Sequence, residues 1–339
     1  MATQPLIPSP PDLHFTEDST PGIVRRRKGK YFAFFAPDGA RVTDRAEIDR
    51  LRAIGLPPAY QKCWYCPDPN GHLQATGYDA RGRKQYRYHP AYRETQDAGK
   101  YAGCATFGHA LPKLRARVEA DLGKRSVDRE RALAALVRLL DIGMIRVGND
   151  RYAEENKSYG ATTLRMRHAA LEGGGLRLSY RGKSGKMHER RVRDAGLTRF
   201  VRAMQDLPGQ RLFQYVDEDG ARHDVLSTDV NAYLRETMGP GISAKHFRTW
   251  GGSVTAFAAL WHDTGTVSLK TMLEQVAEAL GNTPAISRKS YVHPALIELA
   301  KSGDQVAWRA ATSLPRATQW LSREERGFIA FLATLESQE

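Results

Sequence analysis

The pattern of hydrophobic and polar positions changes character near residue 90. Before that point, from Ile23 to about Tyr88, short runs rich in aromatic and β-branched residues end at turn sequences such as Pro37-Asp38-Gly39, which is typical of strands. We expect strands at residues 31–35, 63–65 and 73–78, and a short helix at 44–51. The pattern in this part of the chain therefore predicts a β-rich domain.

After His89-Pro90 the hydrophobic residues recur at helical spacing, beginning with Leu111 to Leu122 and with Gly123 as a C-terminal cap. Further helices are expected at 128–142, with Ser126 as N-cap, and at 229–238, 246–261, 267–280 and 321–335. One β-hairpin is expected, with strands at 176–180 and 188–192 around a turn at 182–186. The pattern predicts an α+β fold.

The expected domain organisation follows from these elements. Residues 1–21, rich in proline and acids, are expected to form a flexible segment. Residues 22–90 are expected to form a small β-rich N-terminal domain. Residues 91–339 are expected to form a larger, mainly α C-terminal domain that carries the β-hairpin as an insert.

Charge is the informative feature of the composition. Lys and Arg total 51 against 38 acids, a net charge of +13, whereas the 41% hydrophobic content is ordinary. Such an excess attracts polyanions, of which a nucleic-acid backbone is the commonest. The three cysteines favour a reducing compartment. Because the sequence has neither a long apolar stretch nor the pattern of a signal peptide, we expect a cytoplasmic protein without membrane contact, nucleoid-associated if it binds DNA.

Two motifs are weak as cofactor sites. Cys63 and Cys66 lack the second ligand pair that a structural zinc needs, so two reduced cysteines in a strand are the simpler interpretation. Gly173-Gly174-Gly175 lacks the Lys and Ser/Thr of a phosphate-binding loop. We expect neither a metal, nor a nucleotide, nor any other cofactor.

The segment from Tyr78 to Tyr88 combines cations with aromatic residues. Its candidate DNA-binding residues are Arg81, Arg83, Lys84, Gln85, Tyr86 and Tyr88. Cations of this kind neutralise phosphates, Gln reaches base edges, and tyrosines stack or donate to phosphate. The alternative is a solvated, charged edge strand. A second basic run, 25–30, fits a DNA-binding patch and a solvated hairpin equally well.

Four later segments each place a cation or a donor beside a tight turn or a helix start. They are 144–149, 180–186, 245–251 and 281–291. Each is weak alone, because a single Arg in an apolar context is usually salt-bridged and a Tyr on a helix usually packs into the core.

Together and in this order, these segments resemble the poxvirus-like branch of the type IB DNA topoisomerases, over roughly residues 23–300. The resemblance implies the α+β fold shared by these enzymes and the tyrosine recombinases. It also implies that Arg146, Lys183 and Arg248 are catalytic cations and that Tyr291 is the nucleophile. By the same match, Gln85, Tyr86, Tyr88 and Tyr152 are expected to contact DNA.

Two positions depart from the viral pattern. Asn282 stands where the viral enzymes carry a histidine before Thr-Pro, and Asn149 stands where they carry a lysine. Asn282 can still donate an N–H to a phosphate oxygen, although it carries no positive charge. We therefore expect Asn282 to serve in catalysis, and Asn149, as a DNA contact, to alter the preferred cleavage sequence.

The implied activity is relaxation of supercoiled duplex DNA by a monomer that clamps the DNA. One strand is cut through a 3′-phosphotyrosyl intermediate, rotates and is resealed; the ester conserves the bond energy, so ATP is not needed.

Two other functions remain open. A tyrosine recombinase uses similar groups, but usually has a His three residues before the second arginine, where this chain has Lys245. A DNA-binding relative without catalytic activity is the other alternative.

Overall fold

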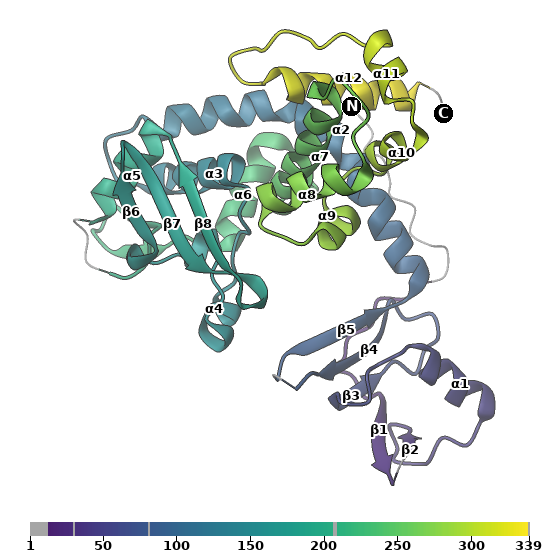
Figure 1. Ribbon diagram of the computed structural model, residues 1–339. Helices are drawn as coiled ribbons and strands as arrows, with labels where there is room; N and C mark the ends of the chain where they lie inside the picture. Colours follow the sequence, from purple (N-terminus) through teal and green to yellow (C-terminus); the bar gives the residue numbers. More distant parts are fainter. Residues whose placement is uncertain (1–12, 30, 81, 206–208, 338–339) are drawn as a thin grey trace. The chain divides into compact units, whose positions relative to one another are not determined.

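The computed structural model describes residues 13–29, 31–80, 82–205 and 209–337. The chain divides between Tyr101 and Ala102 into two compact units. The first holds a β-sheet and the second is mainly helical (Figure 1), so the predicted α+β class is confirmed. Of the predicted flexible segment, residues 1–12 lie outside the described residues, and 13–21 pack on the first sheet through bonds such as Trp64 Nε1 to the Thr20 carbonyl, 2.9 Å.

The first unit is a five-stranded antiparallel sheet with one helix. Its elements are β1 (Ile23–Lys28), β2 (Tyr31–Phe35), α1 (Arg45–Ala53), β3 (Gln61–Tyr65), β4 (Leu73–Tyr78) and β5 (Lys84–Tyr88), and α2 (Pro90–Leu122) begins in this unit. The strand order is β2-β1-β3-β4-β5, so β5 is an edge strand. The three predicted strands and the helix at 44–51 are confirmed. Strands β1 and β5 correspond to the hairpin and the edge strand that were the alternative interpretations of the two basic segments.

A hydrophobic core holds this sheet against α1. Phe34, Tyr65, Ala75 and Leu51 of the helix are buried together in it. Cys63 is also buried there, and Cys66 lies in a smaller cluster beside it; both are free thiols. Cys63 lies within β3 and Cys66 directly follows that strand.

The second unit contains the remaining elements. They are α3 (Arg129–Gly143), α4 (Asp150–Asn156), β6 (Ala169–Glu172), β7 (Gly175–Arg181), β8 (Met187–Val192), α5 (Ala195–Gln205), β9 (Gln214–Val216), β10 (Arg222–Asp224), α6 (Ser227–Met238), α7 (Lys245–His262), α8 (Leu269–Leu280), α9 (Pro284–Ser290), α10 (Pro294–Ser302), α11 (Gln305–Ala311) and α12 (Arg323–Glu336). Three short 3₁₀ turns are η1 (Ala161–Thr163), η2 (Met166–His168) and η3 (Lys183–Gly185).

The sequence located most of the long helices and part of the sheet. Helices α3, α6, α7, α8 and α12 lie within a few residues of their predicted bounds. The predicted hairpin is present as β7 and β8, but β6 adds a third antiparallel strand. The short ribbon of β9 and β10, and the helices α4, α5, α9, α10 and α11, were not predicted.

One predicted helix cap was wrong. The Asp128 carboxylate, and not Ser126, caps α3 by accepting the Arg131 N–H at 2.9 Å. The Ser126 hydroxyl instead donates to Asp128 at 2.6 Å. Asp is as good an N-cap as Ser, and here it stands directly before the helix.

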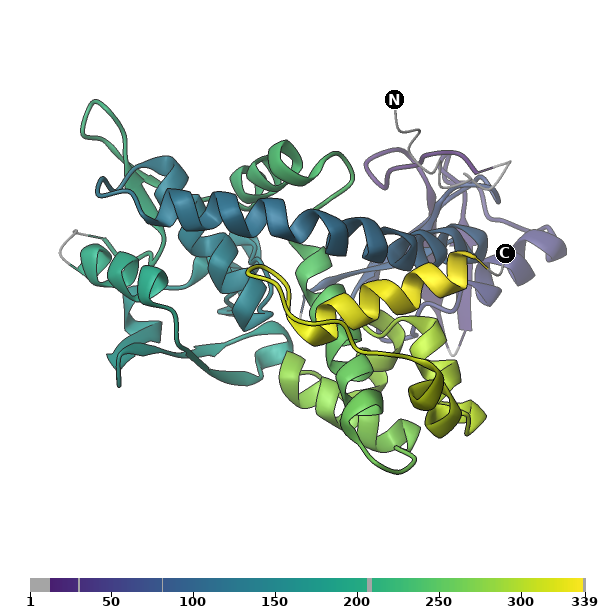
Figure 2. The ribbon, with the colours of Figure 1, turned by 90° about the horizontal axis from the view of Figure 1, so that it is seen from above.

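Helix α7 is central to the second unit, where it packs on α8, α10 and α12. Helix α12 lies along the part of α2 that belongs to this unit (Figure 2). Arg115 of α2 joins the two through Glu325 at 2.7 Å and also binds Asp141 of α3 at 2.8 Å. Trp250 of α7 donates its indole N–H to Glu325 at 3.1 Å. This buried network fixes α7 to three other helices.

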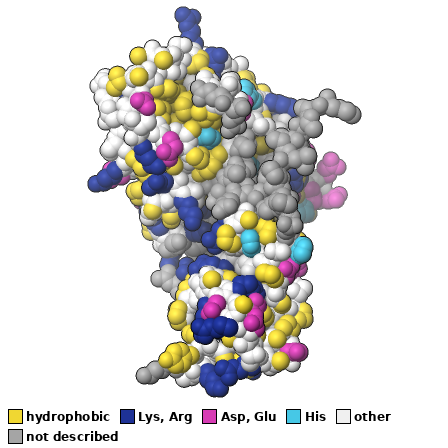
Figure 3. Space-filling model, turned by 90° about the vertical axis from the view of Figure 1, so that its right-hand side faces the viewer, with side chains coloured by type: hydrophobic (Ala, Val, Ile, Leu, Met, Phe, Trp, Pro, Cys, Tyr) yellow, Lys and Arg dark blue, Asp and Glu magenta, His cyan; other side chains and the backbone are white. Residues whose placement is uncertain are grey.

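The surface is strongly basic. Several separate groups of Lys and Arg side chains are seen in the space-filling view, with hydrophobic and a few acidic side chains between them (Figure 3), and the net charge is +13. Within the described residues, no helix has both the length and the hydropathy needed to cross a membrane.

Candidate active site

Three of the predicted catalytic cations line one pocket of the second unit. Arg146 comes from the loop after α3, Lys183 from the turn between β7 and β8, and Arg248 from the first turn of α7. Three segments far apart in the sequence thus place positive side chains around one small cavity. A site of this kind binds an anion.

The backbone around Arg146 is held by the turn η1. The Arg146 carbonyl accepts the Ala161 N–H at 2.8 Å. A Cβ at Gly160 would lie 2.6 Å from that carbonyl oxygen, so only glycine allows the two backbones to approach this closely. Gly148 has a φ of +103°, which also favours glycine. The loop therefore fixes the point from which the Arg146 side chain extends.

Arg248 is buried, with only 4% of its surface exposed. Its guanidinium donates to the carbonyls of Met144 and Leu280, the latter at 3.1 Å, at the C-terminal ends of α3 and α8. These helix ends carry partial negative charge and so stabilise the cation. Burial and the charge of Arg146 nevertheless lower the Arg248 pKa from its ordinary value. A negative group beside Arg248, such as a phosphate, would raise its pKa again and so offset burial and the charge of Arg146.

Tyr291 lies directly against Arg248. The Arg248 guanidinium carbon is 4.7 Å from the centre of the Tyr291 ring. Burial raises the pKa of the Tyr291 phenol, but the charges and hydrogen bonds of Arg248 and Arg146 outweigh burial and hold that pKa below its ordinary value. The phenolate, the nucleophilic form, is therefore easier to reach here than in water.

Helix α7 also holds the backbone of Tyr291. The buried Ser253 hydroxyl donates to the Tyr291 carbonyl at 3.2 Å and accepts the His293 N–H at 3.0 Å. A Cβ at Gly252 would lie 2.8 Å from the Tyr291 carbonyl oxygen. The same helix thus carries Arg248 and positions the tyrosine.

Asn282 completes the cluster. It follows Gly281, the left-handed C-cap of α8, and its N–H donates to the Ala277 carbonyl at 2.9 Å. The Asn282 amide oxygen accepts a 2.9 Å hydrogen bond from Arg146. Its buried amide nitrogen has no partner among the described residues. An unpaired buried donor is costly, so this N–H₂ is suited to a bound acceptor.

Lys183 is the exposed member of the set. It begins the turn η3, which the Gly182 N–H closes by donating to the Lys186 carbonyl at 2.8 Å. Within the described residues the Lys183 ammonium makes neither a hydrogen bond nor an ion pair. It is therefore available to a ligand in the pocket.

Several residues that the sequence did not assign to catalysis also line this pocket. Tyr180, His188 and Arg190 all lie on β7 or β8. Burial and the nearby charges of Arg190, Arg146, Lys186 and Arg248 lower the His188 pKa to about 4, so the imidazole is neutral near pH 7. The alternation of Lys186, His188 and Arg190 along a strand was the available signal, because residues two apart share a face of a strand.

In the first unit, Lys84, Tyr86 and Tyr88 share one face of the edge strand β5. The rings of Tyr86 and Tyr88 are stacked 6.2 Å apart, and the Lys84 ammonium lies 5.5 Å from the Tyr86 ring centre. Both tyrosines are exposed, at 41% and 38%. This face can stack on a flat ligand or donate hydroxyls to an anion.

Arg83, just before this strand, and Lys84 and Gln85 at its start are already paired within the unit. Arg83 and Gln85 both bind Asp79, at 2.7 and 3.1 Å. Lys84 forms an ion pair with Asp18 at 2.5 Å. A phosphate would therefore compete with carboxylates for these cations.

Arg25, the first member of the second basic run, is half-buried and has a structural role. Its guanidinium donates to the carbonyls of Leu56, Pro57 and Tyr60, at 2.9, 2.7 and 3.2 Å. Arg26 lies 4.7 Å from the Phe35 ring. The hairpin interpretation of this run accounts for both contacts.

The remaining predicted DNA contacts are Asn149, Arg81 and Tyr152. Asn149 is exposed just before α4 and does not line the cavity. Arg81 and the side chain of Tyr152 lie outside the described part of the structure.

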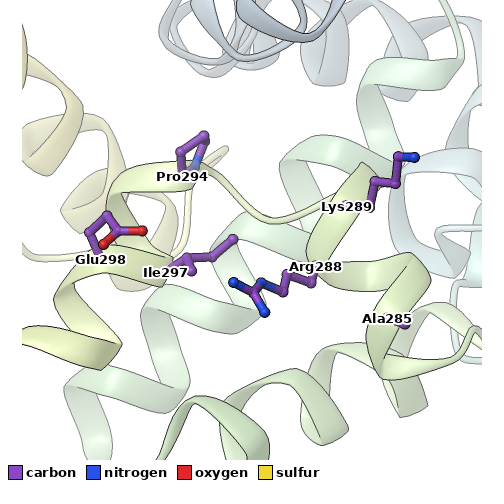
Figure 4. Close-up of a pocket in the computed structure, with 6 residues that line it drawn as sticks. All are labelled: Ala285, Arg288, Lys289, Pro294, Ile297 and Glu298. Atoms are coloured by element: carbon purple, nitrogen blue, oxygen red, sulfur yellow. The ribbon is translucent and has the colours of Figure 1, made fainter.

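A second cavity lies between α9 and α10. It is lined by Ala285, Arg288, Lys289, Pro294, Ile297 and Glu298. The Arg288 side chain extends toward Ile297, whereas that of Lys289 points away (Figure 4). None of the predicted catalytic side chains lines this cavity.

Comparison with known proteins gives two family matches. Residues 89–308 match the sequence model of the eukaryotic DNA topoisomerase I catalytic core, and residues 31–79 match that of the bacterial DNA topoisomerase IB N-terminal domain. DNA topoisomerase 1B of Acanthamoeba polyphaga mimivirus is 31% identical over 298 residues, which cover 84% of this chain and 89% of the relative. DNA topoisomerase 1B of Vaccinia virus (strain Western Reserve) is 22% identical, over 71% of this chain and 76% of the relative.

Among solved structures, the XerH site-specific recombinase bound to difH aligns with 57% of this chain and 50% of its own, at 15% identity and a TM-score of 0.39. A likeness at this level does not decide between a topoisomerase and a recombinase. The sequence matches decide in favour of a topoisomerase, because they span both units and nearly the full length of the mimivirus enzyme. The chain accordingly belongs to the type IB DNA topoisomerase family.

Proposed function

We propose that this chain relaxes supercoiled DNA by cutting one strand through a covalent bond between Tyr291 and a 3′-phosphate. The observation that carries the proposal is the cluster in the second unit: Arg146, Lys183 and Arg248 line one cavity, and the Tyr291 ring lies on the Arg248 guanidinium at 4.7 Å. Family membership supports the activity, and the cluster supplies groups that suit its chemistry.

In the proposed first step, the Tyr291 phenol gives its proton to water, and the phenolate oxygen attacks a phosphodiester phosphorus. A bond forms between that oxygen and phosphorus, and the bond from phosphorus to the 5′ oxygen breaks. Arg146 and Arg248 bind the non-bridging oxygens, where negative charge grows. The amide N–H₂ of Asn282, which has no partner among the described residues, donates to the same phosphate.

The departing 5′ oxygen needs a proton. Lys183 is the proposed donor because its ammonium is exposed in the pocket and makes no competing bond within the described residues. Religation reverses the step: the 5′ hydroxyl attacks phosphorus, its proton returns to Lys183, and Tyr291 leaves. The phenol is a good leaving group because its pKa lies far below that of an alkyl alcohol. The bond energy is conserved, so the cycle needs no ATP.

We further propose that a single chain clamps the duplex. The Lys84, Tyr86 and Tyr88 face of β5 binds one part of the DNA, and the cluster around Tyr291 binds the scissile phosphate. Between cleavage and religation the free 5′ end rotates about the intact strand, restrained by phosphate contacts of the basic surface. A monomer is the simplest oligomeric state that performs this cycle. We propose that it acts in the cytoplasm, on the DNA of the nucleoid.

Relaxation of a supercoiled plasmid tests the proposal. The protein is expected to relax both negative and positive supercoils without ATP and in excess EDTA. Each relaxation event is expected to need one 339-residue chain. Tyr291→Phe is expected to bind the plasmid and leave it supercoiled. Exchange of DNA segments between two defined sites, without relaxation of plasmids that lack them, would instead identify a recombinase.

A further inference from the structure

Strand β8 is docked onto the C-terminal end of α8 by three alternate residues. Lys186, just before the strand, donates to the Asn282 carbonyl at 3.5 Å. Arg190 donates to the Ala279 carbonyl at 2.9 Å. Cations at a helix C-terminus are favourable because that end carries partial negative charge. His188 lies between these two cations on the same face of the strand.

The His188 ring fills the space between two glycines. A Cβ at Gly182 would lie 2.5 Å from Cδ2 and 2.7 Å from Nε2 of the ring, whereas a Cβ at Gly281 would lie 2.6 Å from Nδ1 and 2.7 Å from Cε1. The two edges of the imidazole thus touch two different backbones. Gly182 directly precedes Lys183, and Gly281 directly precedes Asn282.

Tyr180 fixes the orientation of this ring. It pairs with His188 across β7 and β8, and the two rings are stacked 5.4 Å apart at 19°. Both residues are buried, at 4% and 8% exposure. The imidazole is therefore clamped on one face by Tyr180 and on its two edges by the glycines.

A role as a proton carrier does not suit His188. Burial and the charges of Arg190, Arg146, Lys186 and Arg248 keep it unprotonated near pH 7. A neutral, flat and rigid ring between two catalytic segments is instead suited to hold them at a fixed separation.

We infer that His188 is a positioning residue, which braces the turn that carries Lys183 against the end of α8 and so sets the distance from the Lys183 ammonium to Arg146 and Asn282. This inference rests on the proposed function and adds a residue to it. Without the ring, the turn is free to move and Lys183 no longer meets the 5′ oxygen.

The test uses two versions of one suicide duplex, with oxygen or sulfur as the 5′ bridging atom at the cleavage site. A thiolate leaves without being protonated, so cleavage of the sulfur substrate does not need a positioned Lys183. On the oxygen substrate, His188→Ala is expected to lower the single-turnover cleavage rate about 10- to 100-fold, the loss typical of a misplacement near 1 Å. On the sulfur substrate, its rate should stay within about threefold of that of the unmutated protein. Lys183→Ala should show the same pattern with a larger loss.

Two further variants complete the design. His188→Gln keeps a neutral polar side chain of similar length, and should restore part of the rate on the oxygen substrate; it also serves if His188→Ala does not fold. His223→Ala, which removes an exposed histidine of β10, should leave both rates unchanged.

An equal loss on the two substrates would overturn the inference, because it would show a general distortion of the site. No loss on either substrate would overturn it as well. Failure of the unmutated protein to cleave either duplex would overturn the proposed function along with it.

Discussion

The amide oxygen of Asn282 accepts a 2.9 Å hydrogen bond from the Arg146 guanidinium. This bond orients both groups: it holds the arginine toward the pocket and leaves the Asn282 N–H₂, buried and without a partner among the described residues, as a donor. Under the proposed mechanism, this donor allows Asn282 to act at the position where the viral pattern has a histidine.

This arrangement predicts different effects for three substitutions of Asn282. Asn282→Ala removes the donor and releases Arg146, so single-turnover cleavage should fall about 10²-fold, as for one lost preorganised donor. Asn282→Asp keeps the acceptor for Arg146 but adds a negative charge beside the phosphate, so its loss should be larger. Asn282→His should retain most of the activity. Equal rates for all three variants would contradict this role.

The Ser253 hydroxyl is predicted to position the nucleophile. Ser253→Ala removes the bonds to the Tyr291 carbonyl and the His293 N–H, so cleavage should slow about tenfold or more and the protein should lose about 1–3 kcal/mol of stability. Thr255→Ala on the same helix is the matched control, since its hydroxyl donates to the Gly251 carbonyl within the helix itself. DNA affinity, measured in the Tyr291→Phe background, should not change. A loss of affinity without a loss of cleavage rate would contradict the prediction.

The exposed tyrosines of β5 are predicted to bind DNA. Tyr86→Ala and Tyr88→Ala should each weaken duplex binding by about 1–2 kcal/mol, roughly 5- to 30-fold, and Lys84→Ala should also reduce the slope of log K against log salt by about one. Tyr31→Ala, at an exposed position of β2, is the control and should bind normally. Fluorescence anisotropy at several salt concentrations measures both quantities. Equal weakening by Tyr31→Ala would show that the effect is not specific to this face.

The stability of the second unit should fall as the pH is lowered from about 6.5 toward 4. Burial and nearby cations lower the folded-state pKa of His188 to about 4. The folded-state pKa values of His168 and His293 are also about 4, chiefly because both side chains are buried. The unfolded chain, with pKa values near 6.5, binds more protons in this window, so lowering the pH favours unfolding.

Urea unfolding as a function of pH tests this directly. The free energy of unfolding should be greatest above the unfolded pKa. His188→Gln should remove part of the dependence, up to about 1.4 kcal/mol per pH unit, the value for one proton. The comparison with this variant separates His188 from the carboxylates. Identical slopes for the two proteins would show that His188 takes up protons equally in the folded and unfolded states.

The sequence was most informative where one pattern ran long. Helix α8 shows buried Met272, Leu273, Val276 and Ala277 at helical spacing, and was predicted almost to its ends. For strand β1 the sequence left the choice between a hairpin and a DNA-binding patch open, because three of its six residues are arginines; the first of these is half-buried, with its guanidinium bound to backbone carbonyls. Helix α9 has only seven residues, although Thr283 and Pro284 gave the signal of an N-cap and first helical position.

The candidate site shows the same limit. The order of Arg146, Lys183, Arg248, Asn282 and Tyr291 carried a resemblance, but their approach in space depends on loops held by glycines, such as Gly160 against the Arg146 carbonyl. The pairing of Lys84 with Asp18 joins residues whose contact no local pattern predicts. The only sequence signal for His188 was its alternation with Lys186 and Arg190, which is weak because a histidine in a strand is usually structural.

The central claim is that Tyr291 forms the covalent bond to DNA, and one measurement tests it most directly. The protein is trapped on a suicide duplex, digested with a protease and a nuclease, and the nucleotide-bearing peptide is sequenced by mass spectrometry. The expected peptide contains Tyr291 joined to a 3′-phosphate, and Tyr291→Phe yields no adduct. An adduct on another residue, a 5′-phosphate linkage, or an adduct that persists in Tyr291→Phe would contradict the account.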